Sequence, residues 1–175
     1  NKNNLVKEII NILSKWGFSK QGIFNNSKGE WYLFCQILLI LLHFTPPYPK
    51  IKNLEFSINT FVVIIGLAIS IKGLIIMINA FIDLGDNLTP LTYPMDKSSL
   101  IRNKSYKNAR HPLYKGILFI SLGICIFSIS LIHLVLFISL TYILKMKALK
   151  EEEQLKIKFP EYKKYIKEVP AIIKT

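Results

Sequence analysis

The sequence predicts an all-α, polytopic integral membrane protein: a single domain of 175 residues with about four transmembrane helices. Hydrophobic residues make up 51% of the chain. They stand in contiguous blocks rather than in the stripes of a soluble amphipathic helix, and basic residues concentrate between and after those blocks. We therefore expect an amphipathic N-terminal segment, two membrane helices, a cytosolic loop, a tight helical hairpin and a charged cytosolic tail helix. They are assigned to residues 1–30, 31–84, 85–112, 113–147 and 148–175, in that order.

Residues 4–16 form the first expected element, an amphipathic helix. Its apolar face carries Leu5, Ile9, Ile12, Leu13 and Trp16. Such a helix lies in the membrane interface or packs on the cytosolic end of a helix bundle, and the sequence leaves both open. We expect no cleavable signal peptide at this end.

The first apolar block, residues 31–45, begins with Trp31 and Tyr32, which suit the boundary between water and lipid. Its fifteen residues reach only ~22 Å as a helix, short of the ~30 Å hydrocarbon core. The prolines of residues 46–49 end it. We interpret His43 as a polar residue at the end of this helix.

The second block, residues 54–84, is long enough to cross a bilayer with tilt. Lys72 and Asn79 interrupt it. A lysine inside a membrane is costly and often functional, but we favour Lys72 extending its ammonium to the interface or facing the bundle interior.

Two further apolar helices, residues 113–129 and 131–147, are joined around residues 128–130 without a polar linker. This arrangement predicts a tight hairpin whose arms cross most or all of the bilayer. His133 lies at its turn and receives no chemical role. The tail, residues 148–175, is expected to be a charged helix that is too polar to enter lipid.

The charge distribution predicts the topology. The net charge is +12, and of 23 basic residues six fall in residues 97–115 and nine in residues 145–174. The positive-inside rule places both regions in the cytosol, where anionic lipid is the expected partner and nucleic acid is not. Cys35 and Cys125 lie in apolar blocks and indicate neither a disulfide framework nor a metal site.

Two polar motifs frame the hairpin. The first is R-H-P-x-Y-x-G at residues 110–116, and the second is E-E-x-x-L-x-x-x-F-x-x-Y-x-x-Y at residues 151–165. With these motifs and their order, residues 84–170 resemble the isoprenylcysteine carboxyl methyltransferase-like family, which is related to the membrane phospholipid N-methyltransferases.

The resemblance implies a multi-pass membrane methyltransferase that uses S-adenosylmethionine and releases S-adenosylhomocysteine. The cofactor is expected at the cytosolic ends of the helices, between the loop and the tail, without a metal. The implied catalytic residues are Arg110, Lys147 and Glu151. The implied cofactor-binding residues are Leu100, Ile101, Tyr106, His111, Pro112, Tyr114, Gly116 and Glu152.

The chemistry of the charged residues agrees with this assignment. The carboxylates of Glu151 and Glu152 suit the cationic groups or ribose hydroxyls of the cofactor, although adjacent acids can also be a solvated helix face. Lys147 stands one turn before Glu151. Its ammonium is suited to holding an anionic acceptor or to balancing the negative charge of the two glutamates. Alternatively, the side chain has no chemical role and only extends its ammonium to the interface.

The sequence leaves the identity of the methyl acceptor open. An isoprenylcysteine-like carboxylate, a lipid amine and a thiol all fit direct in-line transfer to a lipophilic or membrane-associated acceptor. The sequence also leaves two other functions open. One is an NADPH-dependent membrane reductase related to the sterol reductases, and the other is an inactive membrane scaffold.

Overall fold

The computed structural model describes residues 4–5, 7–8, 13–14, 16–49 and 56–171. Over these residues the chain forms helices and loops and no β-strand, which confirms the all-α prediction for the part of the chain described. The α-helices are α2 (Lys20–Asn25), α3 (Glu30–Leu42), α4 (Phe56–Leu84), α5 (Pro112–Ser128), α6 (Leu131–Lys158) and α7 (Tyr162–Glu168). Two short 3-10 helices, η1 (Gly85–Asn87) and η2 (Lys104–Lys107), lie between α4 and α5.

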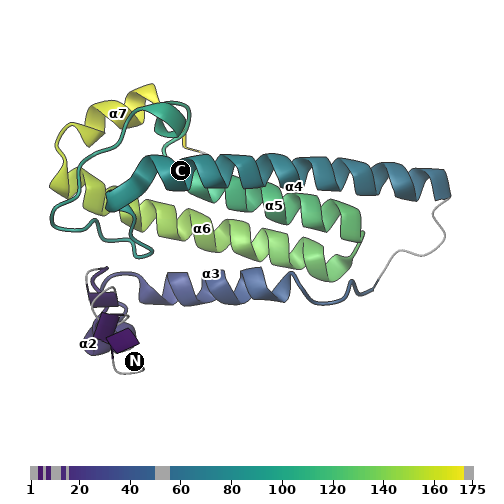
Figure 1. Ribbon diagram of the computed structural model, residues 1–175, viewed down its shortest axis with the longest axis horizontal. Coiled ribbons are helices and arrows are strands. Elements are labelled where there is room, and N and C mark those ends of the chain that lie inside the picture. The colour runs from purple at the N-terminus through teal and green to yellow at the C-terminus, as the bar shows by residue number, and fades with distance from the viewer. Residues whose placement is uncertain (1–3, 6, 9–12, 15, 50–55, 172–175) are drawn as a thin grey trace.

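The four long helices lie side by side in the order α3, α6, α5, α4 (Figure 1). Helix α5 packs on both α4 and α6, and α6 packs in turn on α3. Helix α7 and the loop between α4 and α5 lie at the same end of this bundle, where α3 begins and α6 ends (Figure 1). The two basic regions predicted to share a side are therefore at one end of the molecule.

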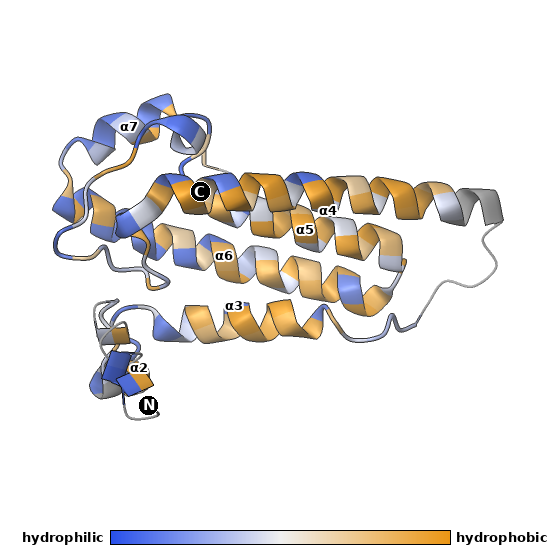
Figure 2. Cartoon of the chain, viewed as in Figure 1, coloured by the Kyte–Doolittle hydropathy of each residue, from blue (hydrophilic) through white to orange (hydrophobic). Residues whose placement is uncertain are grey.

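The long helices carry apolar surface outward. Two segments, Thr60–Asn87 and Leu131–Lys158, are long and apolar enough to cross a membrane, and α3 and α5 are shorter apolar helices. Figure 2 shows these helices as mainly hydrophobic and the end with α7 as mainly hydrophilic. Large exposed hydrophobic side chains include Phe34, Leu38, Phe61, Ile64, Phe81, Leu134 and Ile138. Exposed apolar surface of this extent indicates association with a membrane.

Close contact between α4 and α5 depends on glycines. A Cβ on Gly73 would lie 2.7 Å from the carbonyl oxygen of Gly116. A Cβ on Gly116 would lie 2.6 Å from the Cβ of Met77. Both distances are shorter than van der Waals contact, so a side chain at either position would push the helices apart. Small residues at such positions let membrane helices approach closely.

Hydrogen bonds join three helices at the opposite end. His43 caps α3; its Nδ1 lies 2.7 Å from the carbonyl oxygen of Leu39 and its Nε2 lies 2.6 Å from Ser121 Oγ on α5. The carbonyl can only accept, so a neutral His43 carries its proton on Nδ1 and accepts from Ser121. His133 on α6 donates from Nε2 to the carbonyl oxygen of His43 at 3.2 Å. Both histidines thus hold α3 against the hairpin.

The hairpin is turned as expected, but its second arm is longer. Helix α5 ends at Ser128 and α6 begins at Leu131, and Ile129 between them has a left-handed φ of 45°. We expected the arm to end at residue 147 and a separate tail helix to follow; instead α6 continues to Lys158. No glycine or proline interrupts residues 148–158, and Pro160 comes just after the helix ends.

The N-terminal prediction falls partly outside the described residues, because Ile9 and Ile12 belong to the part that is not described. Leu5 and Leu13 lie in helical turns and are exposed, with 60% and 39% of their surface accessible. The side chains of these two residues are thus not buried in the bundle.

Candidate functional site

A cavity of about 490 Å³ lies at the end of the bundle that holds the loop and α7. It collects side chains from α3, α4, α5, α6, α7 and the intervening loop. Predicted site residues among its lining are Leu100, Ile101, Tyr106, Arg110, His111, Tyr114, Lys147 and Glu151. Residues from the two sequence motifs, separated by the whole hairpin, thus share one cavity.

Arg110 joins the first motif to the tail. Its Nε donates to Glu152 Oε1 at 2.8 Å and its Nη2 to Glu152 Oε2 at 3.4 Å. Its Nη1 donates to the carbonyl oxygens of Ile166 at 3.3 Å and Val169 at 2.8 Å. Four of the five guanidinium donors are therefore used within the protein, and the side chain acts mainly as a clamp on the C-terminal segment.

Glu152 completes this clamp and does not line the cavity. Only 3% of its surface is exposed. Besides Arg110, it accepts a hydrogen bond from His111 Nε2 at 3.1 Å. We expected Glu152 to contact the cofactor directly; its position places it behind Arg110 and His111, where it orients both.

Glu151 is the acid that faces the cavity. Tyr114 donates its hydroxyl to Glu151 Oε2 at 2.8 Å, and His111 Nδ1 lies 3.7 Å from the same oxygen. The side chain of Glu151 is 27% exposed, and among the described residues its hydrogen bond from Tyr114 uses Oε2 and leaves Oε1 without a partner. The His111 ring stacks on Tyr114 with centroids 5.3 Å apart, which holds both side chains beside this carboxylate.

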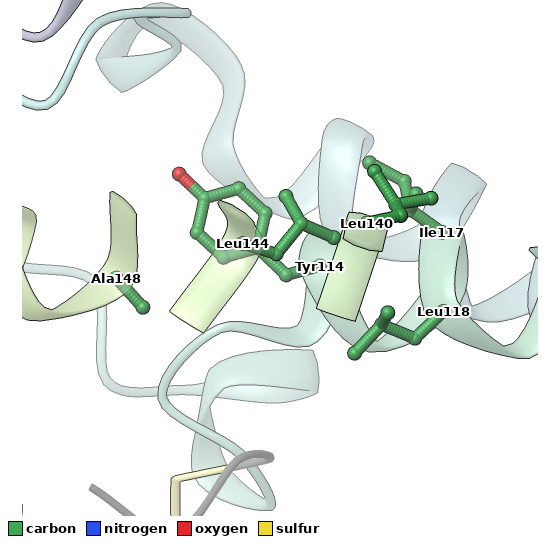
Figure 3. Packing of buried hydrophobic residues seen from close by; sticks show 6 residues of the cluster. All are labelled: Tyr114, Ile117, Leu118, Leu140, Leu144 and Ala148. Carbon is green, nitrogen blue, oxygen red and sulfur yellow. The ribbon is translucent and has the colours of Figure 1, made fainter. Parts of the chain in front are cut away.

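Tyr114 also belongs to the hydrophobic core between α5 and α6. Its ring packs in a cluster with Ile117, Leu118, Leu140, Leu144 and Ala148. Figure 3 shows the ring beside Leu144, with the hydroxyl pointing away from Leu140 and Ile117. Apolar packing on the ring thus holds the polar tip at the cavity.

Lys147 enters the cavity wall from α6 with only 2% of its surface exposed. Its ammonium donates to Gln36 Oε1 on α3 at 2.7 Å and lies 5.4 Å from the centroid of the Tyr114 ring. Gln36 is not among the site residues predicted from the sequence. The available signal was an amide inside an apolar block, where an unpaired polar group is expensive.

The tail forms an aromatic wall. Tyr162, Tyr165 and Val169 are buried together, and the Tyr165 hydroxyl donates to the carbonyl oxygen of Tyr106. Burial raises the pKa of Tyr165 to about 12 and also raises the pKa of Tyr106. These phenols therefore remain protonated donors at neutral pH. Tyr162 and Tyr165 line the cavity together with Leu155 and Phe159, although no individual role was predicted for these four motif residues.

Besides Glu152, two predicted residues stand apart from the cavity lining. Pro112 is the first residue of α5, where a missing N–H costs nothing. Gly116 provides close approach, but to Met77 and Gly73 of α4. Both position the motif rather than the ligand.

The site offers a ligand the carboxylate of Glu151, the buried ammonium of Lys147, several aromatic rings and a largely apolar wall. Such a mixture suits a molecule that has both charged and apolar parts. In comparisons with known proteins, the chain matches no family model, no curated protein and no solved structure.

Proposed function

We propose that this protein is a membrane methyltransferase that transfers a methyl group from S-adenosylmethionine to a lipophilic acceptor. The observation that carries the proposal is the single cavity shared by Arg110, His111 and Tyr114 of the first motif and Glu151 of the second. These motifs are also the ones that resemble the isoprenylcysteine carboxyl methyltransferase-like family. The resemblance supplies the reaction, and the cavity supplies a place for it.

The cavity fits the cofactor in size and chemistry. Its volume of about 490 Å³ lies within the range of ~300–1,000 Å³ common for small-molecule sites. Leu100 and Ile101 offer an apolar surface for a flat base. The carboxylate of Glu151, held by Tyr114, suits an ammonium group, a sulfonium or ribose hydroxyls.

The residues divide into those that face the reactants and those that hold the site closed. When bound, S-adenosylmethionine supplies a methyl group: a lone pair of the acceptor forms a bond to the methyl carbon, and the bond between that carbon and sulfur breaks and leaves its electron pair on sulfur. Glu151 binds and orients the cofactor. Lys147 orients the acceptor. Arg110 and Glu152 keep α7 over the cavity, which excludes water and aligns the reactants.

The proposed membrane arrangement has four crossings, with the cavity on the cytosolic side. Helix α5 has 17 residues and extends ~26 Å, close to the ~30 Å hydrocarbon core. Lys72 neighbours Gly73, which packs against Gly116 one turn inside α5. Lys72 is exposed, and its ammonium, which lies 5.6 Å from the centroid of the Phe119 ring, can extend from that depth to the cytosolic interface. The many basic residues of the loop and tail then meet anionic lipid.

Cofactor binding tests the proposal. Isothermal titration of the purified protein in detergent should show binding of S-adenosylhomocysteine, unaffected by chelator, and no binding of NADPH. Incubation with labelled cofactor and a total lipid extract, followed by mass spectrometry, should then yield a labelled lipophilic product. Absence of S-adenosylhomocysteine binding at millimolar ligand would reject the assignment, and binding of NADPH alone would favour a reductase.

A further inference from the structure

Gln36 and Lys147 form a buried pair 111 residues apart in the chain. Gln36 is 7% exposed and Lys147 is 2% exposed, and both line the cavity. An ammonium group has donors and no acceptor, so the amide oxygen of Gln36 has to face it. The contact of 2.7 Å therefore fixes the direction of both side chains.

The ammonium of Lys147 has fewer acceptors than its burial requires. A charge removed from water needs compensating hydrogen bonds or an ion pair. Among the described residues no carboxylate lies within ion-pair distance of Lys147. Glu151, one turn further along α6, already accepts from Tyr114. The Gln36 oxygen is one acceptor for three N–H donors, so donors remain for a group in the cavity.

We propose that Gln36 is a positioning residue for methyl transfer: it holds the Lys147 ammonium so that its remaining donors face the acceptor. This inference rests on the proposed function. Gln36 acts through Lys147 and not on the reacting atoms. Without it, the Tyr114 ring at 5.4 Å is the partner that the described residues leave to the Lys147 ammonium, and a ring fixes direction less well than a hydrogen bond.

A simpler role for Gln36 is to fasten α3 to α6. The chain offers a matched control for this role, because His43 on the same helix is also 7% exposed and hydrogen-bonds Ser121 of α5. His43 does not line the cavity. His43→Leu therefore removes a comparable anchor of α3 and leaves the pair of Gln36 and Lys147 in place.

The test compares Gln36→Leu, Lys147→Met, the double variant and His43→Leu with the parent in detergent. Affinity for S-adenosylhomocysteine and the single-turnover rate of transfer from labelled cofactor to total lipid extract are measured for each. Gln36→Leu should keep the affinity and lower the rate about tenfold or more, as expected for a hydrogen bond to a charged group. The double variant should be no slower than Lys147→Met, and His43→Leu should keep the parent rate.

A second readout needs no turnover. Acetic anhydride modification of Lys147, measured by mass spectrometry relative to the exposed Lys163, should become faster in Gln36→Leu and stay unchanged in His43→Leu. Unchanged acetylation in Gln36→Leu, an additive loss of rate in the double variant, or an equal loss in His43→Leu would each overturn the inference. If the parent fails to bind S-adenosylhomocysteine, the proposed function fails. The acetylation rates then show separately whether Gln36 holds the Lys147 ammonium.

Discussion

Arg110 Nε and Glu152 Oε1 lie 2.8 Å apart in a buried ion pair, although 42 residues separate them in the chain. The same guanidinium donates to two carbonyl oxygens of the tail. The Arg110 side chain thus connects the start of α5, the C-terminal part of α6 and the segment after α7. The cavity wall formed by Tyr162 and Tyr165 depends on this connection.

Glu152→Gln should loosen the tail. Removing the charge leaves Arg110 buried without its counter-ion, which costs about 3 kcal/mol of stability. Trypsin should then cleave faster after Lys163 and Lys164 in α7. Glu153→Gln is the matched control, because it removes the same charge from an exposed neighbour. Equal resistance to trypsin in the parent and Glu152→Gln would show that the ion pair does not hold the tail.

Gly73→Leu should separate α4 from α5. A side chain there meets the backbone of Gly116 and Ile120, and overpacking of this kind costs about 1–3 kcal/mol. The unfolding temperature in detergent should fall, while Ala68→Leu, on an exposed face of α4, should leave it unchanged. Equal temperatures for the two variants would contradict the close packing of these helices.

Tyr165 should make the fold sensitive to alkali. Its pKa is raised from 10.0 to about 12, chiefly by burial. A group whose folded pKa is raised contributes stability that is complete below the unfolded pKa and is lost as pH rises through the folded pKa. Stability should therefore decline between about pH 10 and pH 12, and Tyr165→Phe should flatten that decline. Denaturant titrations across this range measure it, and an unchanged slope in Tyr165→Phe would assign the decline to other groups.

The sequence predicted the elements better than the contacts between them. Continuous apolar blocks and the R-H-P-x-Y-x-G motif placed the start of α5 within one residue of Pro112. The end of α6 was wrong because the change from apolar to charged residues at 147 marks a change of surroundings, not a break in the backbone. A helix continues through such a boundary until a residue such as Pro160 ends it.

Many residues that line the cavity could be predicted, but the contacts between them could not. Motif residues such as Tyr114 and Glu151 were named because the two motifs resemble those of a known family. That Glu151 faces the cavity while Glu152 turns to Arg110 follows from the rotation of α6 against α5, which sequence spacing alone does not determine. Gln36 was missed because its role exists only through Lys147, on a helix far away in the chain.

We propose that the cavity binds the cofactor through Glu151. Isothermal titration of S-adenosylhomocysteine into the parent, Glu151→Gln and Glu153→Gln tests it most directly. A charge-assisted hydrogen bond contributes about 1.5–3 kcal/mol, so Glu151→Gln should bind about ten- to a hundred-fold more weakly. Glu153→Gln, whose side chain is exposed, should bind like the parent. Equal affinity in Glu151→Gln and the parent, or no binding by the parent, would contradict the account.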